Sequence, residues 1–324
     1  MIKLLLLLAV TTILSAKYTN CTFQNKNYTE ICKKVVKKGV SVDYANRFLL
    51  SPKTKKLDNR SFNLFKASKI KTHRKNEKRA NNTLVKYLPK MINHLKEYKE
   101  VYDEAERKYS VNREIVAAIL LKETKLGTIK PSFDAFRVFN TLVVKTEVKT
   151  TRDKWLLNMG KTNLVSIIDY CYKKGFSPST CNFKSSYAGA VGIPQFMPNS
   201  FVYIDGYKKK VGDLSVMEDA IMSASKYLNK KAKFKKLIEW EKIPDMKVVE
   251  AQWYDYEFKH KNSSLVYSKN TKTKKSYKCF TCKKDELSYL REYAKKIMRY
   301  NNSSNYAIGV MRLAYDSYYY NSPK

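Results

Sequence analysis

Helical spacing of apolar residues is the feature that most limits what this chain of 324 residues can fold into. From residue 84 onward, apolar side chains recur every three or four positions, the pattern of a helix with one buried face. We expect helices over 84–102, 111–127, 133–144, 156–170, 216–228 and 287–297. Strand alternation is scarce and predicts only a short hairpin over 253–258 and 264–268. The pattern therefore favours a mainly α protein of one or two domains.

The apolar helix predicted over 111–127 carries Glu123 near its end. Leu120 and Ile119 stand three and four positions earlier, so the carboxyl shares their apolar face. Its direct neighbour Lys122 is predicted to face elsewhere. Desolvation disfavours a charged carboxyl and raises its pKa, which suits a proton donor near neutral pH. The competing interpretation of the same residue is a solvated glutamate in a charged run.

Two later segments have residue types that suit a sugar-binding site. Residues 185–198 are rich in alanine and glycine, which let a backbone approach another backbone or a sugar closely. Residues 298–307 combine tyrosine and asparagine, which offer a flat apolar face together with paired hydrogen-bond donors and acceptors.

Together, the Glu123 helix and these two segments resemble the lytic murein transglycosylase B family, which cleaves the glycan strands of peptidoglycan. The match is good over 84–228 and 285–315. It implies a lysozyme-like helical core with a small accessory lobe or insertion, and no cofactor. It also implies that Glu123 protonates the glycosidic oxygen between MurNAc and GlcNAc. Glu123 would then accept the proton of the C6 hydroxyl, which attacks C1 of the same sugar and leaves a 1,6-anhydromuramic end.

The same resemblance implies five substrate-binding residues: Ser186, Gln195, Tyr300, Asn301 and Tyr306. Ser186 and Gln195 would hydrogen-bond the sugar or orient Glu123. Tyr300 and Asn301 would lie near the carboxyl, and Tyr306 would line the groove. The alternatives are that polar groups of the 185–198 segment only satisfy backbone, and that Tyr306 is a core aromatic residue with a satisfied hydroxyl.

The sequence departs from the family where several members carry an acidic, calcium-binding loop. The corresponding residues 205–213 contain three consecutive lysines, Lys208–Lys210, which would repel the ion. The three histidines are widely separated, and the Cys279–Cys282 motif has no second pair to complete a zinc site. We therefore predict no metal site.

The domain organisation is predicted in five parts. Residues 1–16 read as a signal peptide, 17–80 as a basic helical segment packing on the core, and 81–239 as the catalytic core. Residues 240–284 are predicted to form an insertion or small lobe, and 285–324 a C-terminal helical segment that completes the active site.

The signal segment predicts export to the periplasm, without a lipoprotein anchor because no lipobox precedes Cys21. The apolar run is too short for a stable membrane span. Six cysteines fall into the local pairs Cys21/Cys32, Cys171/Cys181 and Cys279/Cys282, although six cysteines allow fifteen connectivities. An oxidising compartment would permit three disulfides.

The formal net charge of +35 predicts attraction to polyanions. After export the available polyanion is the cell wall, so the predicted partners are peptidoglycan glycan strands and, as candidates, other cell-wall enzymes. No nucleic-acid-binding motif is present, and we expect no nucleic-acid partner.

Two other functions remain open from the sequence. A muramidase would use water instead of the C6 hydroxyl on the same substrate. A non-catalytic cell-wall-binding factor would keep the groove without the chemistry.

Overall fold

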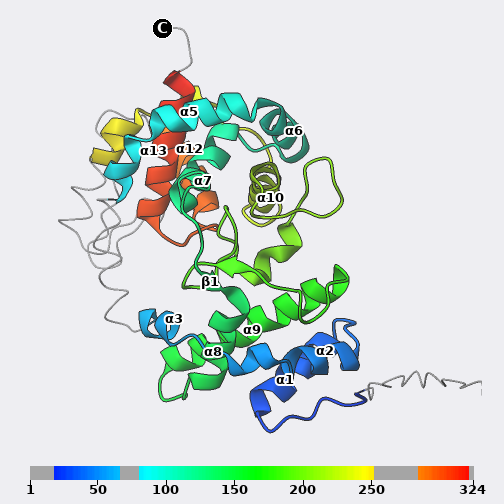
Figure 1. Cartoon of the computed structure of the whole chain (residues 1–324). Helices are drawn as coiled ribbons and strands as arrows, with labels where there is room; N and C mark the ends of the chain where they lie inside the picture. Colours follow the sequence, from blue (N-terminus) through cyan, green and yellow to red (C-terminus); the bar gives the residue numbers. More distant parts are fainter. Residues whose placement is uncertain (1–17, 66–79, 252–283, 321–324) are drawn as a thin grey trace, which may run out of the picture.

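A computed structural model describes residues 18–65, 80–251 and 284–320 and confirms the mainly α fold (Figure 1). Its helices are α1 (Lys26–Val36), α2 (Val42–Leu49), α3 (Asn59–Leu64), α5 (Leu88–Glu97), α6 (Lys99–Tyr109), α7 (Arg113–Thr124), α8 (Ala135–Lys145), α9 (Thr151–Lys173), α10 (Met217–Lys230), α12 (Lys284–Ile297) and α13 (Ser304–Tyr320), with the 3-10 helices η1 (Pro52–Lys55), η2 (Pro198–Tyr203) and η3 (Trp240–Lys242). The strands β1 (Phe133–Asp134) and β2 (Lys184–Ser185) pair antiparallel. The signal segment, the predicted hairpin, most of the predicted 240–284 insertion and the Cys279–Cys282 motif lie outside the described residues.

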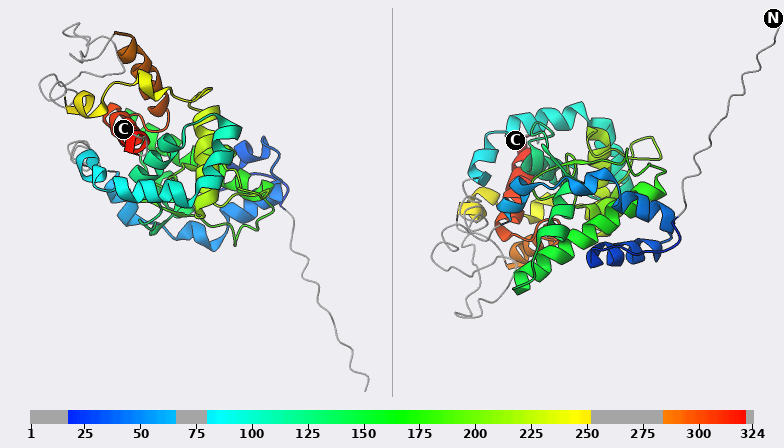
Figure 2. Two further views of the ribbon diagram at one scale, coloured as in Figure 1. Left: turned by 90° about the horizontal axis from the view of Figure 1, so that it is seen from above. Right: turned by 60° about the horizontal axis from the view of Figure 1, so that its bottom comes forward.

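Two hydrophobic clusters organise the described chain. One joins α5, α6, α7, α10, α12 and α13, and the other joins α1, α2, α8 and α9. Figure 1 shows the first group in the upper half of the view and the second in the lower half, with β1 between them. The left view of Figure 2, seen from above, also separates the N-terminal helices (blue) from α13 (red).

Helix α7 lies inside the first cluster, and α5, α6, α10 and α13 all contact it. Every residue from Ile115 to Leu121 is buried, so the helix is enclosed on all sides. Partial exposure is found at its two ends, at Arg113 and Glu114 and again at Lys122 and Glu123. Glu123 thus follows directly on the buried apolar stretch of α7.

The predicted helix over 84–102 was wrong as one element. The chain divides into α5 and α6 at Tyr98, which leaves helical geometry at φ −101° and ψ 27° and serves as the boundary of both helices. No glycine or proline marks this break, so the apolar spacing alone runs straight across it.

The N-terminal helices are attached to the second cluster through α8 and α9. Two predicted disulfides are confirmed: Cys21–Cys32 fixes the entry to α1, and Cys171–Cys181 ties the end of α9 to the loop that follows it. Among the described residues, no helix has the length and apolar character needed to cross a membrane.

Candidate active site

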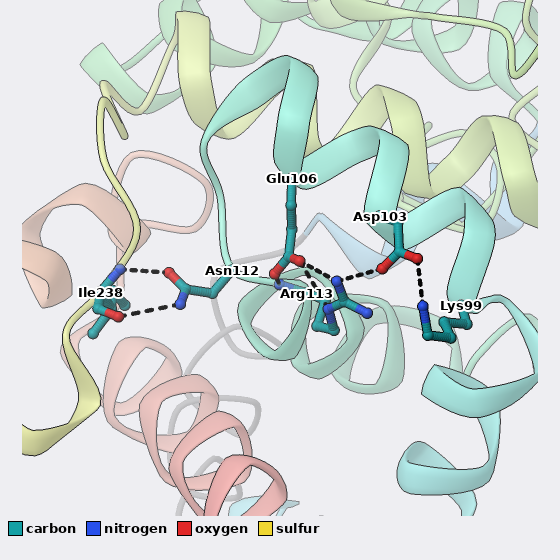
Figure 3. A network of polar contacts seen from close by, with 6 residues as sticks. All are labelled: Lys99, Asp103, Glu106, Asn112, Arg113 and Ile238. Atoms are coloured by element: carbon teal, nitrogen blue, oxygen red, sulfur yellow. Dashed lines mark hydrogen bonds and ion pairs between the residues drawn. The ribbon is translucent and has the colours of Figure 1, made fainter.

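The start of α7 is held by contacts with two neighbouring segments, the backbone at Ile238 and the acidic side chains of α6 (Figure 3). Asn112 pairs with the backbone of Ile238: its Oδ1 accepts from the Ile238 amide at 2.6 Å, and its Nδ2 donates to the carbonyl at 3.3 Å. Because Asn112 is used in this way, the carboxylate of Glu106 caps the helix instead, accepting from the Arg113 amide at 2.8 Å. The Arg113 guanidinium also bridges Glu106 and Asp103. Helix α7 is therefore anchored at the end opposite Glu123.

The end of α7 is set by an uncommon backbone. Lys125, Leu126 and Gly127 all have positive φ, at 51°, 57° and 73°. The helix consequently stops at Thr124, three residues before the predicted stop at Gly127. The Thr124 hydroxyl donates to the Ile193 carbonyl at 3.0 Å, which joins the helix end to the segment 185–198.

Burial raises the pKa of Glu123 to about 7. The nearby helix C-terminus, with its partial negative charge, acts in the same direction. Two groups lower the pKa and so offset part of the effect of burial. The hydroxyl of Tyr306 donates to Oε1 at 2.7 Å, and Lys122 contributes its positive charge. The outcome is a carboxyl that can hold or release a proton near neutral pH.

Tyr306 is thus more than a groove-lining residue, because its hydroxyl binds the candidate acid directly. The side chain is buried in the first turn of α13. Lys122 was expected to face away from the site, yet its Nζ lies 5.1 Å from the centre of the Tyr306 ring. A long, flexible side chain reaches a neighbour that the direction of its Cα–Cβ bond does not predict.

Asn81 links Lys122 to Asn305, the residue before Tyr306, and was missed from the sequence. Its side chain is buried, accepts from the Lys122 ammonium, and donates to the Asn305 carbonyl at 2.8 Å. The contacts fix the position of α13 relative to α7, and with it the hydroxyl of Tyr306. No sequence signal marks Asn81, which precedes the segment that resembles the family.

Tyr300 lies beside Glu123 without bonding to it. Its hydroxyl donates to the Pro194 carbonyl, and its ring packs against Tyr227 with centroids 4.9 Å apart. Burial and then the charge of Glu123 raise the pKa of this phenol well above its usual value. Tyr300 therefore presents a neutral, largely apolar surface beside Glu123. Its hydrogen bond to Pro194 joins the segment 298–307 to the segment 185–198.

The remaining predicted site residues differ in their contacts. Gln195 is half-buried, has φ 53°, and donates from Nε2 to the Gly192 carbonyl at 2.8 Å. Ser186 accepts at Oγ from the Ala190 amide at 3.3 Å. Both side chains thus stabilise their own turn and neither hydrogen-bonds to Glu123 in this structure. Asn301 is exposed in the connection between α12 and α13.

A cavity of about 410 Å³ opens beside this turn and is lined by Gly127, Gly192, Ile193 and residues of the 211–215 segment, among others. Aromatic side chains form much of its remaining wall: Tyr170, Phe176 and Phe183. Glu123 is not among the residues that line this cavity.

No carboxylate of the described residues contributes to the pKa shift of Glu123. Glu114 also has a pKa raised by burial to about 7, but it lies nine residues earlier on α7, roughly 13 Å along the helix axis. Two-carboxylate glycosidases hold their acids about 5–10 Å apart. The described residues also contain no group of three or more histidine, cysteine or acidic side chains able to hold a metal.

Comparison with solved structures identifies the same architecture in several bacterial enzymes. SltB3 of Pseudomonas aeruginosa, in complex with NAG-anhNAM-pentapeptide, is 16% identical, with 89% of this chain and 78% of that one covered at a TM-score of 0.59. SltB1 of the same organism is 18% identical, with 90% and 99% covered and a TM-score of 0.57. Escherichia coli lytic transglycosylase Slt35, in complex with calcium, is 16% identical, with 94% and 96% covered and a TM-score of 0.57.

No curated protein matches the chain by sequence. The family model described as the transglycosylase SLT domain matches residues 23–315, which is most of the chain. The fold agrees with that match, since its helical core is the lysozyme-like core of the lytic transglycosylases. This protein therefore belongs to the family of transglycosylase SLT-domain enzymes.

Proposed function

We propose that this protein is a peptidoglycan lytic transglycosylase in which Glu123 serves as both acid and base. The observation that carries the proposal is the carboxyl of Glu123, with a pKa near 7 and a hydrogen bond from Tyr306. Family membership supports the reaction class, and the SltB3 complexes with NAG-NAM-pentapeptide and NAG-anhNAM-pentapeptide support the substrate class.

In the first step, protonated Glu123 gives its proton to the glycosidic oxygen while the bond from that oxygen to C1 of MurNAc breaks. The resulting carboxylate is stabilised by the Tyr306 hydroxyl and the Lys122 charge. In the second step the C6 hydroxyl attacks C1, and Glu123 takes back one proton from that hydroxyl. No water is consumed, and one residue is sufficient because the nucleophile belongs to the substrate.

The saccharide would lie against the aromatic wall and the turn that follows β2. Tyr300 offers its ring, while the amide oxygen of Gln195 and the exposed Asn301 side chain offer hydrogen bonds. We assign Ser186 to shaping this turn, with contact to the sugar secondary. The half-buried state of Gln195 supports its role, since sugar hydroxyls can reach it.

Export to the periplasm is part of the proposal. Two disulfides among the described residues suit an oxidising compartment, and the positive net charge of 35 suits a wall rich in carboxylates. Neither the signal peptide nor a partner beyond peptidoglycan is needed for the chemistry.

We further propose that the reaction needs no calcium, although Slt35 was solved in complex with that ion. Calcium prefers six to eight oxygen ligands. In the 205–213 loop of this chain, Asp205 binds Lys108 and Tyr109, while Asp213 accepts from Ser215. The residues present therefore do not fit the ion.

The products separate the candidate functions. Purified peptidoglycan is digested with the protein, and the released muropeptides are identified by mass spectrometry. We expect muropeptides that end in 1,6-anhydromuramic acid. Each is lighter by the mass of one water than the muropeptide that hydrolysis would release. Reducing ends would instead establish a muramidase that uses the same acid. Absence of soluble products, with the protein still sedimenting with the wall, would favour a binding factor.

The pH dependence of cleavage should follow Glu123. Because the first step needs the protonated carboxyl, kcat/KM is expected to fall as pH rises through about 7. The Tyr306→Phe variant removes a hydrogen bond that lowers the pKa, so this limb should move to higher pH while activity drops about 10-fold or more. Tyr315→Phe, on the same helix, is the control. If the fall in kcat/KM occurs at the same pH in Tyr306→Phe as in the wild type, a group other than Glu123 controls it.

A further inference from the structure

Asp219, which the proposed chemistry does not use, is buried in the first turn of α10. Its side chain is 1% exposed and receives three donors. The Tyr207 amide donates to Oδ1 at 2.9 Å, the Asp213 amide donates to Oδ2 at 2.7 Å, and the Lys209 ammonium lies 2.6 Å from Oδ2. All three donors come from the segment 205–215, so this carboxylate binds the loop at three points along its length.

The charge on Asp219 needs compensation, because a buried carboxylate without a counter-charge is strongly destabilising. Lys209 supplies that counter-charge, and their hydrogen bond raises the pKa of the ammonium. The neighbouring Lys210 is exposed in the same loop, and the ion pair of Asp219 is made by Lys209. Of the three consecutive lysines, Lys209 is therefore the one whose ammonium pairs with Asp219.

The loop is also fastened at its start and is too tight for larger residues. The Ser223 hydroxyl accepts from the Asp205 amide at 2.9 Å and donates to its carbonyl at 3.1 Å. A Cβ added to Gly206 would lie 2.6 Å from the Lys209 carbonyl oxygen, and one added to Gly212 would lie 2.5 Å from the Asp205 carbonyl oxygen, so the turn at Lys209 and the two ends of the loop are in direct contact. Movement of Lys209 would consequently be transmitted to the rest of the loop.

This loop supports the turn that contacts the catalytic helix. The Leu214 carbonyl accepts from the Ile193 amide at 2.8 Å, and Gly192 packs directly on Leu214. The Ile193 carbonyl in turn accepts from Thr124, the residue after Glu123. A continuous series of contacts thus runs from Asp219 through the loop and the turn to the end of α7.

We propose that the Lys209 ammonium is a built-in cation that closes the 205–215 loop on Asp219 in the way a bound metal ion would. Lys209 is thereby a positioning residue for the turn that holds Ile193 against Thr124. This positioning role rests on the function proposed for Glu123, whereas closure of the loop by Lys209 is independent of it.

The first test measures thermal unfolding of the full chain and needs no activity. The wild type is expected to melt at the same temperature in excess calcium chloride as in EDTA. Lys209→Met should lower the melting temperature by roughly 3–6 °C, Lys209→Arg should restore most of that loss, and the matched control Lys210→Met should leave it unchanged. The proposal that Lys209 acts as a built-in cation would be overturned by a higher melting temperature of the wild type in calcium. Equal losses of melting temperature in Lys209→Met and Lys210→Met would overturn it as well.

The second test measures cleavage of peptidoglycan at room temperature, where the variants remain folded. Lys209→Met is expected to reduce kcat several-fold with little change in KM, and Lys209→Arg to recover it. Unchanged kcat in Lys209→Met, despite the lower melting temperature, would limit Lys209 to stability and remove its positioning role. Inactive wild-type protein with the expected melting data would instead contradict the function proposed for Glu123, so the two failures are distinguishable.

Discussion

The Glu123→Gln variant is expected to lose roughly 1,000-fold or more of its turnover on peptidoglycan while keeping its fold. Glutamine has nearly the same shape, and its amide oxygen can still accept from Tyr306. It cannot donate a proton to the glycosidic oxygen or take one from the C6 hydroxyl. Replacing one carboxyl oxygen by an amide nitrogen therefore blocks both proposed steps. Residual cleavage within about 10-fold of wild type would assign the acid elsewhere.

The same substitution should stabilise the protein above neutral pH. The folded pKa of about 7 is raised from an ordinary value of 4.5, so the folded state holds the proton more tightly than the unfolded state. The wild type accordingly loses stability as pH rises from about 4.5 to about 7, and Glu123→Gln would not share this loss. The measurement is denaturant unfolding of the wild type and of Glu123→Gln at two pH values. Below the unfolded pKa of 4.5 the two proteins should be equally stable, and above the folded pKa of about 7 the variant should be the more stable.

Glu114→Gln is the matched control for both measurements. Burial also raises the pKa of Glu114 to about 7, so this variant should gain stability over the same pH range. It lies at the other end of α7 and should retain full activity. Loss of activity in both variants would mean that the helix, and not the carboxyl of Glu123, is being tested.

The sequence was sufficient to locate Glu123, because a helix brings residues three and four positions apart onto one face regardless of the rest of the fold. Through resemblance it placed Tyr300 and Asn301 near the carboxyl and Tyr306 along the groove, and the structure places the Tyr306 hydroxyl on the carboxyl itself. The sequence could not assign the Tyr306 hydroxyl to Glu123, because that bond joins residues 183 positions apart and depends on how α13 packs on α7.

The bounds of a helix are hard to predict where its apolar pattern is not informative. Between α5 and α6 the pattern is continuous, yet the backbone breaks at Tyr98. Helix α13 is buried along most of its length and has apolar residues on nearly every side, so its sequence shows no single stripe. Lys122 and Asn81 were missed for a related reason, since the contacts of long or polar side chains are decided by tertiary packing.

The Gly192→Ala variant is expected to lose about 3–4 kcal/mol of unfolding free energy. Gly192 has φ +70°, where any side chain strains the backbone, and an added Cβ would lie 2.3 Å from the Cβ of Leu214 and 2.5 Å from its carbonyl oxygen. Because the opposing atoms belong largely to the backbone, the contact cannot be relieved by a change of rotamer. The turn that supports Thr124 would have to move.

Gly175 separates the two causes of this loss, because it has nearly the same backbone conformation, with φ +72°, but nothing within 4 Å of the place that a Cβ would occupy. Gly175→Ala should therefore show backbone strain alone, about 1 kcal/mol. Urea unfolding of the two variants measures the difference, which is the cost of the contact with Leu214. Equal losses would mean that the turn can move away from Leu214 freely. In that event cleavage by Gly192→Ala should stay near the wild-type rate, whereas a rigid turn predicts that activity and stability fall together.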